Sequence, residues 1–243
     1  VMDAAKRKRA SLEGLLVVGI TGSYGKTSMK EYVATLLAQK FKVLKTEANN
    51  NTEMGVAQTI LNRLDESYDV FVAEMGAYRK GEIAQSASMA QPNIGVLTGI
   101  GPQHLSLFGS MQNIQEAKYE LIESLPEKGL AIFNGDDDYT RALFRQCKNP
   151  KRVYTTDPLF DLTASGIRAE SIRFVEQGME MRIKDGSREA TITTALLGRH
   201  NATNLLGAIA VARALGMDYD EIQAGIKTIQ PIPHTMQKLA GIK

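Results

Sequence analysis

Residues near the start of the chain have the composition of a phosphate-binding loop. The segment Thr21–Thr27 (TGSYGKT) stands between an apolar run, Leu15–Ile20, and a stretch whose apolar residues recur at helical spacing. Glycines let backbone N–H groups approach phosphate oxygens, and the start of a helix adds partial positive charge. In such a loop Lys26 would contact the β- and γ-phosphates of a nucleotide, and Thr27 would be a Mg²⁺ ligand.

One position departs from the general pattern of such loops. That pattern has a glycine five residues before Gly25, and the residue there is Ile20. The alternative interpretation is a glycine-rich turn between a strand and a helix, with a surface lysine. The all-apolar strand before the loop, and the Gly-Lys-Thr sequence that opens the helix, favour the phosphate-binding interpretation.

Three further residues could complete a nucleotide and metal site. Glu74 ends the apolar run 69–73, so it would lie at the carboxyl edge of the sheet, where open α/β sheets bind ligands and where a carboxylate can hold Mg²⁺. His104 follows the predicted strand 94–98, and Lys118 lies on the next predicted helix. Spacing alone leaves other roles open for them: a solvated strand end, a structural histidine and a surface lysine.

The elements that must position these residues alternate between strand and helix through residue 155. Such alternation predicts a parallel sheet covered on both faces. From there the pattern becomes antiparallel, with a hairpin over 167–183 and a strand over 190–196, and two helices follow. We therefore predict an α/β fold: a mostly parallel sheet of the P-loop type with helices on both faces, plus a small antiparallel strand subdomain at about 160–197.

Composition restricts the function further. Lys and Arg total 29 and Asp and Glu total 27, so the net charge of +2 provides no overall field for nucleic acid. A single cysteine, Cys147, excludes an internal disulfide and a multi-cysteine zinc site, and fits a cytoplasmic protein. The longest aliphatic run, Leu15–Ile20, is far shorter than the roughly 18 residues of a membrane span. The basic cluster Lys6–Arg9 predicts a solvated helical turn.

Several segments, in order along the chain, resemble sequence patterns of the Mur ligase family. The loop at 20–27 has the shortened form of that family's ATP loop. The other matching segments are Asn50–Gly55, Ala73–Ala77 with Gly81–Ile83, Gln103–Leu105 with Phe108–Ser110, Ala117–Leu121, Asn134–Asp137 and Gly198–Asn204. The resemblance extends from Val17 to about Gln237. Its Gly-Ala…Gly-Glu-Ile and Phe-Gly-Ser elements point to the branch that adds D-alanyl-D-alanine to UDP-N-acetylmuramoyl-tripeptide.

The resemblance implies roles for residues in these segments. The ATP-binding loop would consist of Gly22, Ser23, Tyr24, Gly25, Lys26, Thr27 and Ser28. Thr27 and Glu74 would hold one Mg²⁺, and His104 would hold a second together with Lys118. For this Lys118 would be carbamylated, which turns a repelling ammonium into an anionic oxygen ligand. Lys26, Lys118 and His104 would be the catalytic residues.

The remaining implied roles concern adenine and substrate. Asn201 and Asn204 would face adenine, with Asn204 favoured, and Asn51 and Thr52 would lie near the substrate. The implied reaction is ADP-forming amide ligation in the synthesis of peptidoglycan precursors. The carboxylate of a UDP-muramoyl peptide would be activated as an acyl phosphate, and an amino acid or dipeptide would then attack it.

Members of the family have three domains, and the resemblance covers only the central, ATP-binding one. We expect residues 1–14 to be a leading basic helix or linker, 15–237 to be the central domain, and 238–243 to begin a further domain. Both joined substrates would be bound through the other domains, so this segment alone should not form the amide. We expect a monomer.

Two departures keep alternatives open. Thr235 stands where the family has an arginine that helps to hold the nucleotide, so a nucleotide-binding module without ligase activity is one alternative. Thr52 stands where many members of the suggested branch have a second asparagine. A second alternative is a folylpolyglutamate synthetase, which shares the ATP-binding core, and the match over 76–83 disfavours it.

Overall fold

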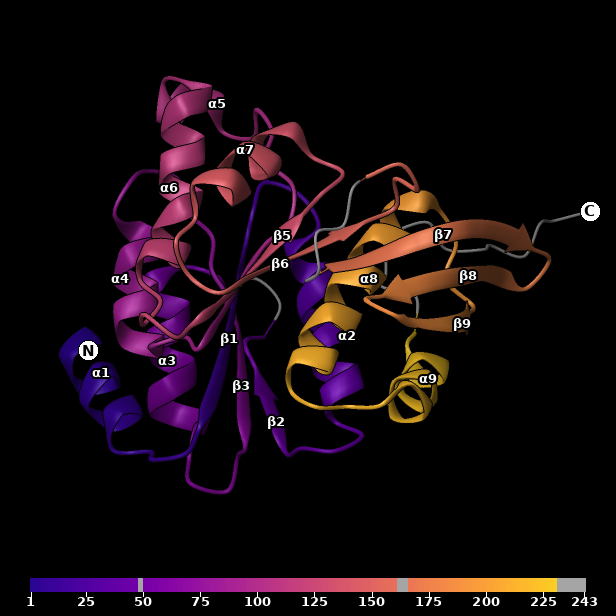
Figure 1. Ribbon diagram of the computed structural model, residues 1–243. Coiled ribbons are helices and arrows are strands. Elements are labelled where there is room, and N and C mark those ends of the chain that lie inside the picture. Colours follow the sequence, from indigo (N-terminus) through magenta and orange to yellow (C-terminus); the bar gives the residue numbers. More distant parts are fainter. Residues whose placement is uncertain (48–49, 161–165, 231–243) are drawn as a thin grey trace, which may run out of the picture.

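A computed structural model describes residues 1–47, 50–160 and 166–230, and these residues form a nine-stranded sheet with helices on both faces (Figure 1). The strand order is β2-β3-β1-β4-β5-β6-β7-β8-β9. The strands are β1 (Leu16–Thr21), β2 (Val43–Lys45), β3 (Val70–Glu74), β4 (Ile94–Leu97), β5 (Leu130–Asn134), β6 (Lys151–Thr155), β7 (Gly166–Val175), β8 (Gly178–Asp185) and β9 (Arg188–Thr194). The predicted α/β fold is confirmed.

The helices divide between the two faces. One face carries α2 (Lys26–Leu37), α8 (Arg199–Ala214) and α9 (Tyr219–Thr228). The other carries α1 (Met2–Ala10), α3 (Glu53–Arg63), α4 (Glu82–Ala90), α5 (Leu105–Phe108), α6 (Met111–Glu123) and α7 (Asp138–Gln146). Each face has its own apolar core, because successive side chains of a strand point to opposite sides of the sheet. No helix in these ranges combines the length and apolar character needed to cross a bilayer.

Strand β1 is the centre of the parallel part. It pairs with β3 on one side and β4 on the other, with Ile20 opposite Glu74 and Val96. Its apolar sequence suits this position because both faces of the strand are buried. Gly19 lets α6 approach closely, since a Cβ there would lie 2.7 Å from a methyl group of Leu121. The carboxyl ends of three parallel strands therefore meet where the phosphate loop begins.

The antiparallel strands extend the main sheet. β7 pairs in parallel with β6, with Tyr154 opposite Ile167, and then antiparallel with β8, which pairs with β9. The core on the α8 and α9 side continues under these strands through residues such as Met181 and Ile192. The predicted antiparallel part is present, but it shares its core with the parallel part. Thr235 and the expected boundary after residue 237 lie outside the described residues.

Two local features do not follow from the sequence patterns. Helix α6, which carries Lys118, begins at Met111, and the Ser110 hydroxyl caps it by accepting the Asn113 N–H at 3.1 Å. The short helix α5 was not predicted. It lies within the turn-rich segment between β4 and α6, where a single helical turn has no periodic pattern to reveal it.

The basic cluster Lys6–Arg9 on α1 was predicted to be solvated, but one of its residues, Arg9, is buried. Arg9 is only 8% exposed, because α1 packs against α3 and α4. Its guanidinium donates hydrogen bonds to the backbone carbonyls of Ala90 (3.1 Å), Leu15 (3.0 Å) and Leu12 (3.2 Å). Arg9 thus ties the leading helix to the start of β1 and the end of α4.

We predict that Arg9→Ala lowers the free energy of unfolding by about 2–4 kcal/mol, because it removes charged hydrogen bonds and leaves buried carbonyls without partners. Arg7→Ala is the matched control on the exposed face of the same helix, with an expected change within about 0.5 kcal/mol. Urea unfolding followed by circular dichroism measures both. Equal midpoints for the two variants would contradict the anchoring role of Arg9.

Candidate active site

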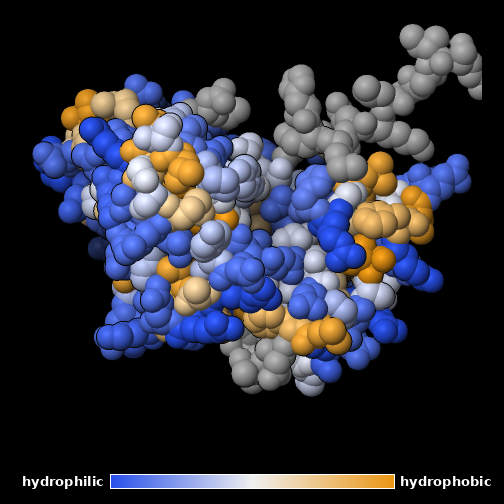
Figure 2. Space-filling model, turned by 90° about the horizontal axis from the view of Figure 1, so that it is seen from above, coloured by the Kyte–Doolittle hydropathy of each residue, from blue (hydrophilic) through white to orange (hydrophobic). Residues whose placement is uncertain are grey.

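The sequence-predicted site residues gather at the carboxyl ends of the parallel strands. This edge points upward in Figure 1, where α5 and α7 follow β4 and β5. Figure 2 looks onto the molecule from this side, where hydrophilic residues predominate and hydrophobic residues form separate patches. The Thr21–Thr27 segment leaves β1 at this edge, and Glu74 ends the neighbouring β3. A polar site therefore lies where open α/β sheets bind ligands.

The first half of the phosphate loop is pinned to the segment after β4. The Ser23 N–H donates to the Gly99 carbonyl at 2.6 Å, and the Ser23 hydroxyl lies 3.0 Å from both the N–H and the carbonyl of Gly101. Gly22 must be glycine because its φ is 151° and a Cβ would lie 2.0 Å from the Thr98 hydroxyl oxygen. These contacts fix the path of the loop.

The second half of the loop supplies the groups that can bind an anion. Gly25, with φ 81°, is the N-cap of α2, so the backbone N–H groups of Lys26, Thr27 and Ser28 open the helix. The first N–H groups of a helix have no carbonyl one turn earlier to bond with, and they carry the positive end of the helix dipole. The Lys26 ammonium lies beside the loop, 3.2 Å from the Ser23 carbonyl oxygen. This half of the loop can receive phosphate oxygens.

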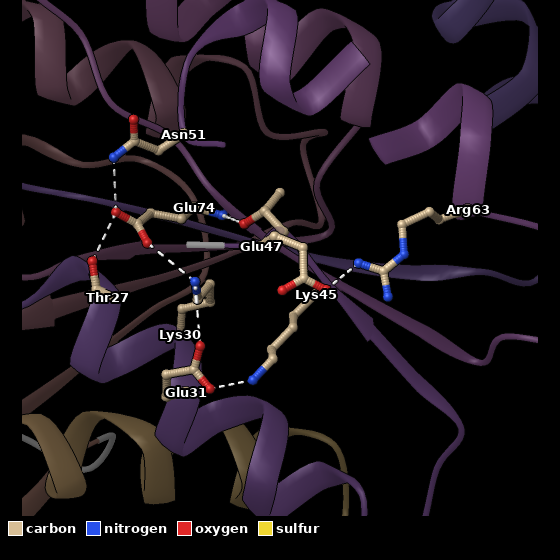
Figure 3. Close-up of polar contacts among 9 residues, drawn as sticks. Thr27, Lys30, Glu31, Lys45, Glu47, Asn51, Arg63 and Glu74 are labelled. Atoms are coloured by element: carbon tan, nitrogen blue, oxygen red, sulfur yellow. Dashed lines mark hydrogen bonds and ion pairs between the residues drawn. The ribbon is translucent and has the colours of Figure 1, made fainter. Parts of the chain in front are cut away.

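Glu74 is the buried acid of the site (Figure 3). It is 2% exposed, and its Oε1 accepts hydrogen bonds from the Thr27 hydroxyl at 3.1 Å and the Asn51 amide at 3.0 Å. Its Oε2 lies 3.6 Å from the Nζ of Lys30. The carboxylate therefore lies directly against the start of α2, next to the hydroxyl expected to bind Mg²⁺.

Lys118 is buried on α6, near Lys26 of the phosphate loop. It is 3% exposed, and its Nζ lies 5.7 Å from the centre of the Phe108 ring. Burial, reinforced by the nearby positive charge of Lys26, lowers the pKa of Lys118 from 10.5 to about 8, against the opposing charges of Glu120 and Glu82. Burial also lowers the pKa of Lys26, and the charge of Glu74 opposes that shift. Two lysines thus share a poorly solvated region, which favours an anionic ligand or the loss of one positive charge.

His104 is exposed and holds an unusual backbone conformation, with φ 57°. Its ring packs against Tyr78, with the ring centres 4.7 Å apart. The loop that carries Tyr78 is held by the Gly-Glu-Ile segment, because the Glu82 carboxylate accepts the Tyr78 N–H at 2.7 Å. Glu120 holds the same loop by accepting the Gly81 N–H at 2.7 Å. Glu82, which belongs to one of the family patterns, therefore helps to hold the loop that places Tyr78 against His104.

The two asparagines of α8 have different surroundings. The side-chain Oδ1 of Asn201 accepts a hydrogen bond from the Tyr32 hydroxyl at 2.8 Å, and its side-chain amide donates to the backbone carbonyl of Leu197 at 2.7 Å. Asn201 is 2% exposed and joins α8 to α2, so both ends of its side chain have protein partners. Asn204 instead lies against the phosphate loop, where a Cβ on Gly25 would be 2.7 Å from its Oδ1. Of the pair, Asn204 is the one next to the phosphate loop.

Asn51 and Thr52, the two residues predicted to lie near the substrate, come directly before α3. Asn51 is fixed by the Gly76 N–H, which donates to its carbonyl at 2.6 Å, and its amide is the partner of Glu74. Thr52 caps α3, since its hydroxyl accepts the Gly55 N–H at 3.2 Å. A contact of either residue with substrate stays a prediction.

Sequence reasoning missed two residues of the site, Lys30 and Tyr78. Lys30 follows Lys26 by four positions and Thr27 by three, which places it on the same side of α2. That spacing could have revealed it. Tyr78 carries no such signal, because its contact with His104 joins two loops that are distant in sequence.

The oxygen groups of this site are better suited to bind Mg²⁺ that is also held by a nucleotide than to bind Mg²⁺ by themselves. Across the described ranges, no group of three or more His, Cys, Asp or Glu side chains converges as a metal site. Mg²⁺ commonly keeps several waters and is bound by one or two carboxylates plus substrate phosphates. Glu74 and Thr27, next to a loop built for phosphate, match that requirement.

The comparisons with known proteins agree with this geometry. Residues 20–212 match the family model of the Mur ligase middle domain. The UDP-N-acetylmuramoyl-tripeptide–D-alanyl-D-alanine ligase of Escherichia coli K12 is 34% identical over 218 residues, which cover 89% of this chain and 47% of that protein. The chain thus belongs to the Mur ligase family, as the sequence patterns predicted.

Solved structures point to one branch of the family. MurF from Acinetobacter baumannii has a TM-score of 0.86 and 27% identity, covering 96% of this chain and 50% of that one. The MurF ligase from Thermotoga maritima, solved in complex with ADP, has a TM-score of 0.84 and 27% identity, covering 96% and 52%. The chain spans about half the length of each of these relatives.

The lowered pKa of Lys118 predicts a pH dependence of stability. In the unfolded chain the pKa returns to about 10.5, so the unfolded state binds more protons between pH 8 and 10.5. The free energy of unfolding therefore increases as pH rises from 8 to 10.5, because Lys118 loses its proton in the folded state first. Below pH 8 this stabilising contribution is absent. Lys118→Met should remove that slope and stabilise the protein near pH 7 by about 3 kcal/mol.

Urea unfolding at several pH values in CO₂-free buffer measures this effect as the difference between variant and parent. Lys128→Met, at an exposed position, controls for the loss of one lysine. A difference between Lys118→Met and the parent that does not change with pH would contradict the prediction.

Proposed function

We propose that this chain is the ATP-binding central domain of a ligase that joins D-alanyl-D-alanine to UDP-N-acetylmuramoyl-tripeptide. The observation that carries the proposal is the placement of buried Glu74 against Thr27 at the start of the phosphate-loop helix. The matched relative from Escherichia coli bears the name of this activity, and the Thermotoga maritima structure was solved with ADP. The proposed reaction consumes ATP in the cytoplasm.

The site residues then have distinct binding roles. Lys26 and the N–H groups at the start of α2 bind the β- and γ-phosphates. Asn204, next to Gly25, is the residue we propose for the adenine side, and Asn201 holds α8 in place through Tyr32. Thr27 and Glu74 would hold Mg²⁺, which when bound neutralises charge on the phosphates.

The proposed reaction has two steps. An oxygen of the tripeptide carboxylate attacks the γ-phosphorus of ATP, and the bond between this phosphorus and the oxygen that bridges it to the β-phosphate breaks. The products of this step are ADP and an acyl phosphate. The amine of D-alanyl-D-alanine then attacks the carbonyl carbon, phosphate leaves with the bonding electrons, and the nitrogen loses a proton. The protein contributes position and positive charge rather than a covalent bond. Lys26 is the group placed to stabilise the charge that develops on the transferring phosphoryl group.

Lys118 is the proposed site of carbamylation. Its neutral Nζ would attack CO₂ and lose a proton, leaving an N-carboxylate on the side chain. The pKa of about 8 supports this step, because a larger fraction of the amine is neutral near pH 7 than for a solvated lysine. The carbamate would also relieve repulsion from Lys26 and provide an anionic ligand for a second Mg²⁺ beside His104.

The UDP-sugar and the dipeptide would be bound by two further domains, consistent with the half-length match to relatives. By this proposal the central domain alone forms no amide, and the whole ligase acts as a monomer. A folylpolyglutamate synthetase has weaker support, because the matched relative at 34% identity is named a D-alanyl-D-alanine ligase.

The first test is nucleotide binding. Lys26→Ala should weaken Mg²⁺-dependent ATP binding at least about 100-fold, because a charged contact to phosphate is worth roughly 3 kcal/mol or more in a poorly solvated site. Lys128→Ala, at an exposed position, is the matched control with unchanged affinity. Isothermal titration calorimetry measures both. Equal ATP affinity of Lys26→Ala and the parent would refute the proposed phosphate site.

The second test addresses the carbamate in the complete three-domain enzyme. Lys118→Ala should abolish most of the ligation, and added short-chain carboxylates should restore part of it by replacing the missing anion. Lys80→Ala, which removes an exposed lysine, should retain activity and show no response to carboxylates. Full activity of Lys118→Ala, or loss of activity that carboxylates do not relieve, would argue against the carbamate.

A further inference from the structure

Lys30 is a fully buried lysine next to the proposed metal ligand. Its side chain is 0% exposed, and its Nζ has no hydrogen-bond partner. The Nζ lies 3.6 Å from Oε2 of Glu74 and 3.3 Å from Oε1 of Glu31 (Figure 3). Burial of an ammonium costs free energy, and these two carboxylates are the groups that offset it.

The surrounding charges form a chain that leads from the site to the surface. Glu74 pairs with Lys30, Lys30 with Glu31, and Glu31 with Lys45. Glu74 is almost fully buried, whereas the Lys45 side chain is 36% exposed. Two carboxylates and two ammonium groups alternate, so the chain has no net charge before any metal is bound.

The two oxygens of Glu74 have different partners. Oε1 faces the hydroxyl of Thr27 and the amide of Asn51, which are neutral groups. Oε2 faces the ammonium of Lys30, one helical turn further along α2 than Thr27. Oε2 therefore lies against the Lys30 ammonium, while Oε1 remains beside the phosphate loop, where a metal can be shared with phosphate oxygens.

We propose that Lys30 is a positioning residue that acts as the built-in counter-ion of Glu74. It keeps this carboxylate buried and oriented when no metal is bound. It also makes Mg²⁺ binding depend on the nucleotide, because a carboxylate whose charge is already balanced attracts a free cation weakly. The phosphates then supply the additional negative charge that brings in Mg²⁺. This inference rests on the proposed function, in which Glu74 is a Mg²⁺ ligand.

The test compares thermal unfolding of the nucleotide-free protein in EDTA, in millimolar Mg²⁺, and in NaCl of matched ionic strength. The parent should have the same Tm in all three solutions. Lys30→Met leaves Glu74 and Glu31 without their shared cation, so its Tm in EDTA should fall by roughly 6–20 °C. Mg²⁺ should replace the missing cation and restore at least half of this loss, and NaCl should not.

Two further variants separate the charge from packing. Lys30→Met combined with Glu74→Gln removes both charges of the inner pair, so its Tm should return toward that of the parent and should not respond to Mg²⁺. Lys45→Met removes the partly exposed lysine of the same chain and should change the Tm little, without a Mg²⁺ response.

The outcomes are distinct. The inference is overturned if Lys30→Met has the Tm of the parent in EDTA, if Mg²⁺ and NaCl affect it equally, or if the double variant is as unstable as the single one. If Lys30→Met does not fold but the double variant does, the counter-ion role is supported. If neither folds, it is overturned. Absence of Mg²⁺-dependent ATP binding by the parent would instead refute the proposed function.

Discussion

The contact between the Glu74 carboxylate and the start of α2 is the constraint on which the rest of the site depends. It exists because β1 and β3 are adjacent and in register, so the end of one strand lies beside the loop that leaves the other. A buried carboxylate is tolerated only where donors and a cation surround it. Thr27, Asn51 and Lys30 provide these groups from two elements that are separate in sequence.

The same site also brings two positive charges close together. Lys26 and Lys118 are both poorly solvated, and the charge of Lys26 makes the charged form of Lys118 less favourable. A bound phosphate group would offset the positive charge of Lys26, and a carbamate would remove that of Lys118. The domain thus holds near the loop both a carboxylate with its counter-ion and a pair of poorly solvated lysines, which is an arrangement suited to a Mg²⁺–nucleotide complex.

Several residues of the family patterns support the site without being placed to touch a ligand. Glu82 and Glu120 hold the loop that brings Tyr78 against His104. Asp137 caps α7 and also accepts the Ile100 N–H at 3.3 Å, which ties it to the segment that pins the phosphate loop. Such residues are recognisable as patterns, but a pattern does not distinguish a residue that binds a ligand from one that positions its neighbours.

The sequence by itself determined the alternation of strands and helices, the phosphate loop and its place after a buried strand, because these depend on local periodicity and on glycine spacing. Tertiary structure decided the rest. It buried Arg9 and Lys30, gave Asn201 a structural partner, and brought Tyr78 to His104. Those outcomes depend on which elements pack together. A lysine on a predicted helix has the same sequence pattern whether its side chain lies in water or against a buried carboxylate. Only the pairing of β1 with β3 placed Glu74 beside α2 and made Lys30 part of the site.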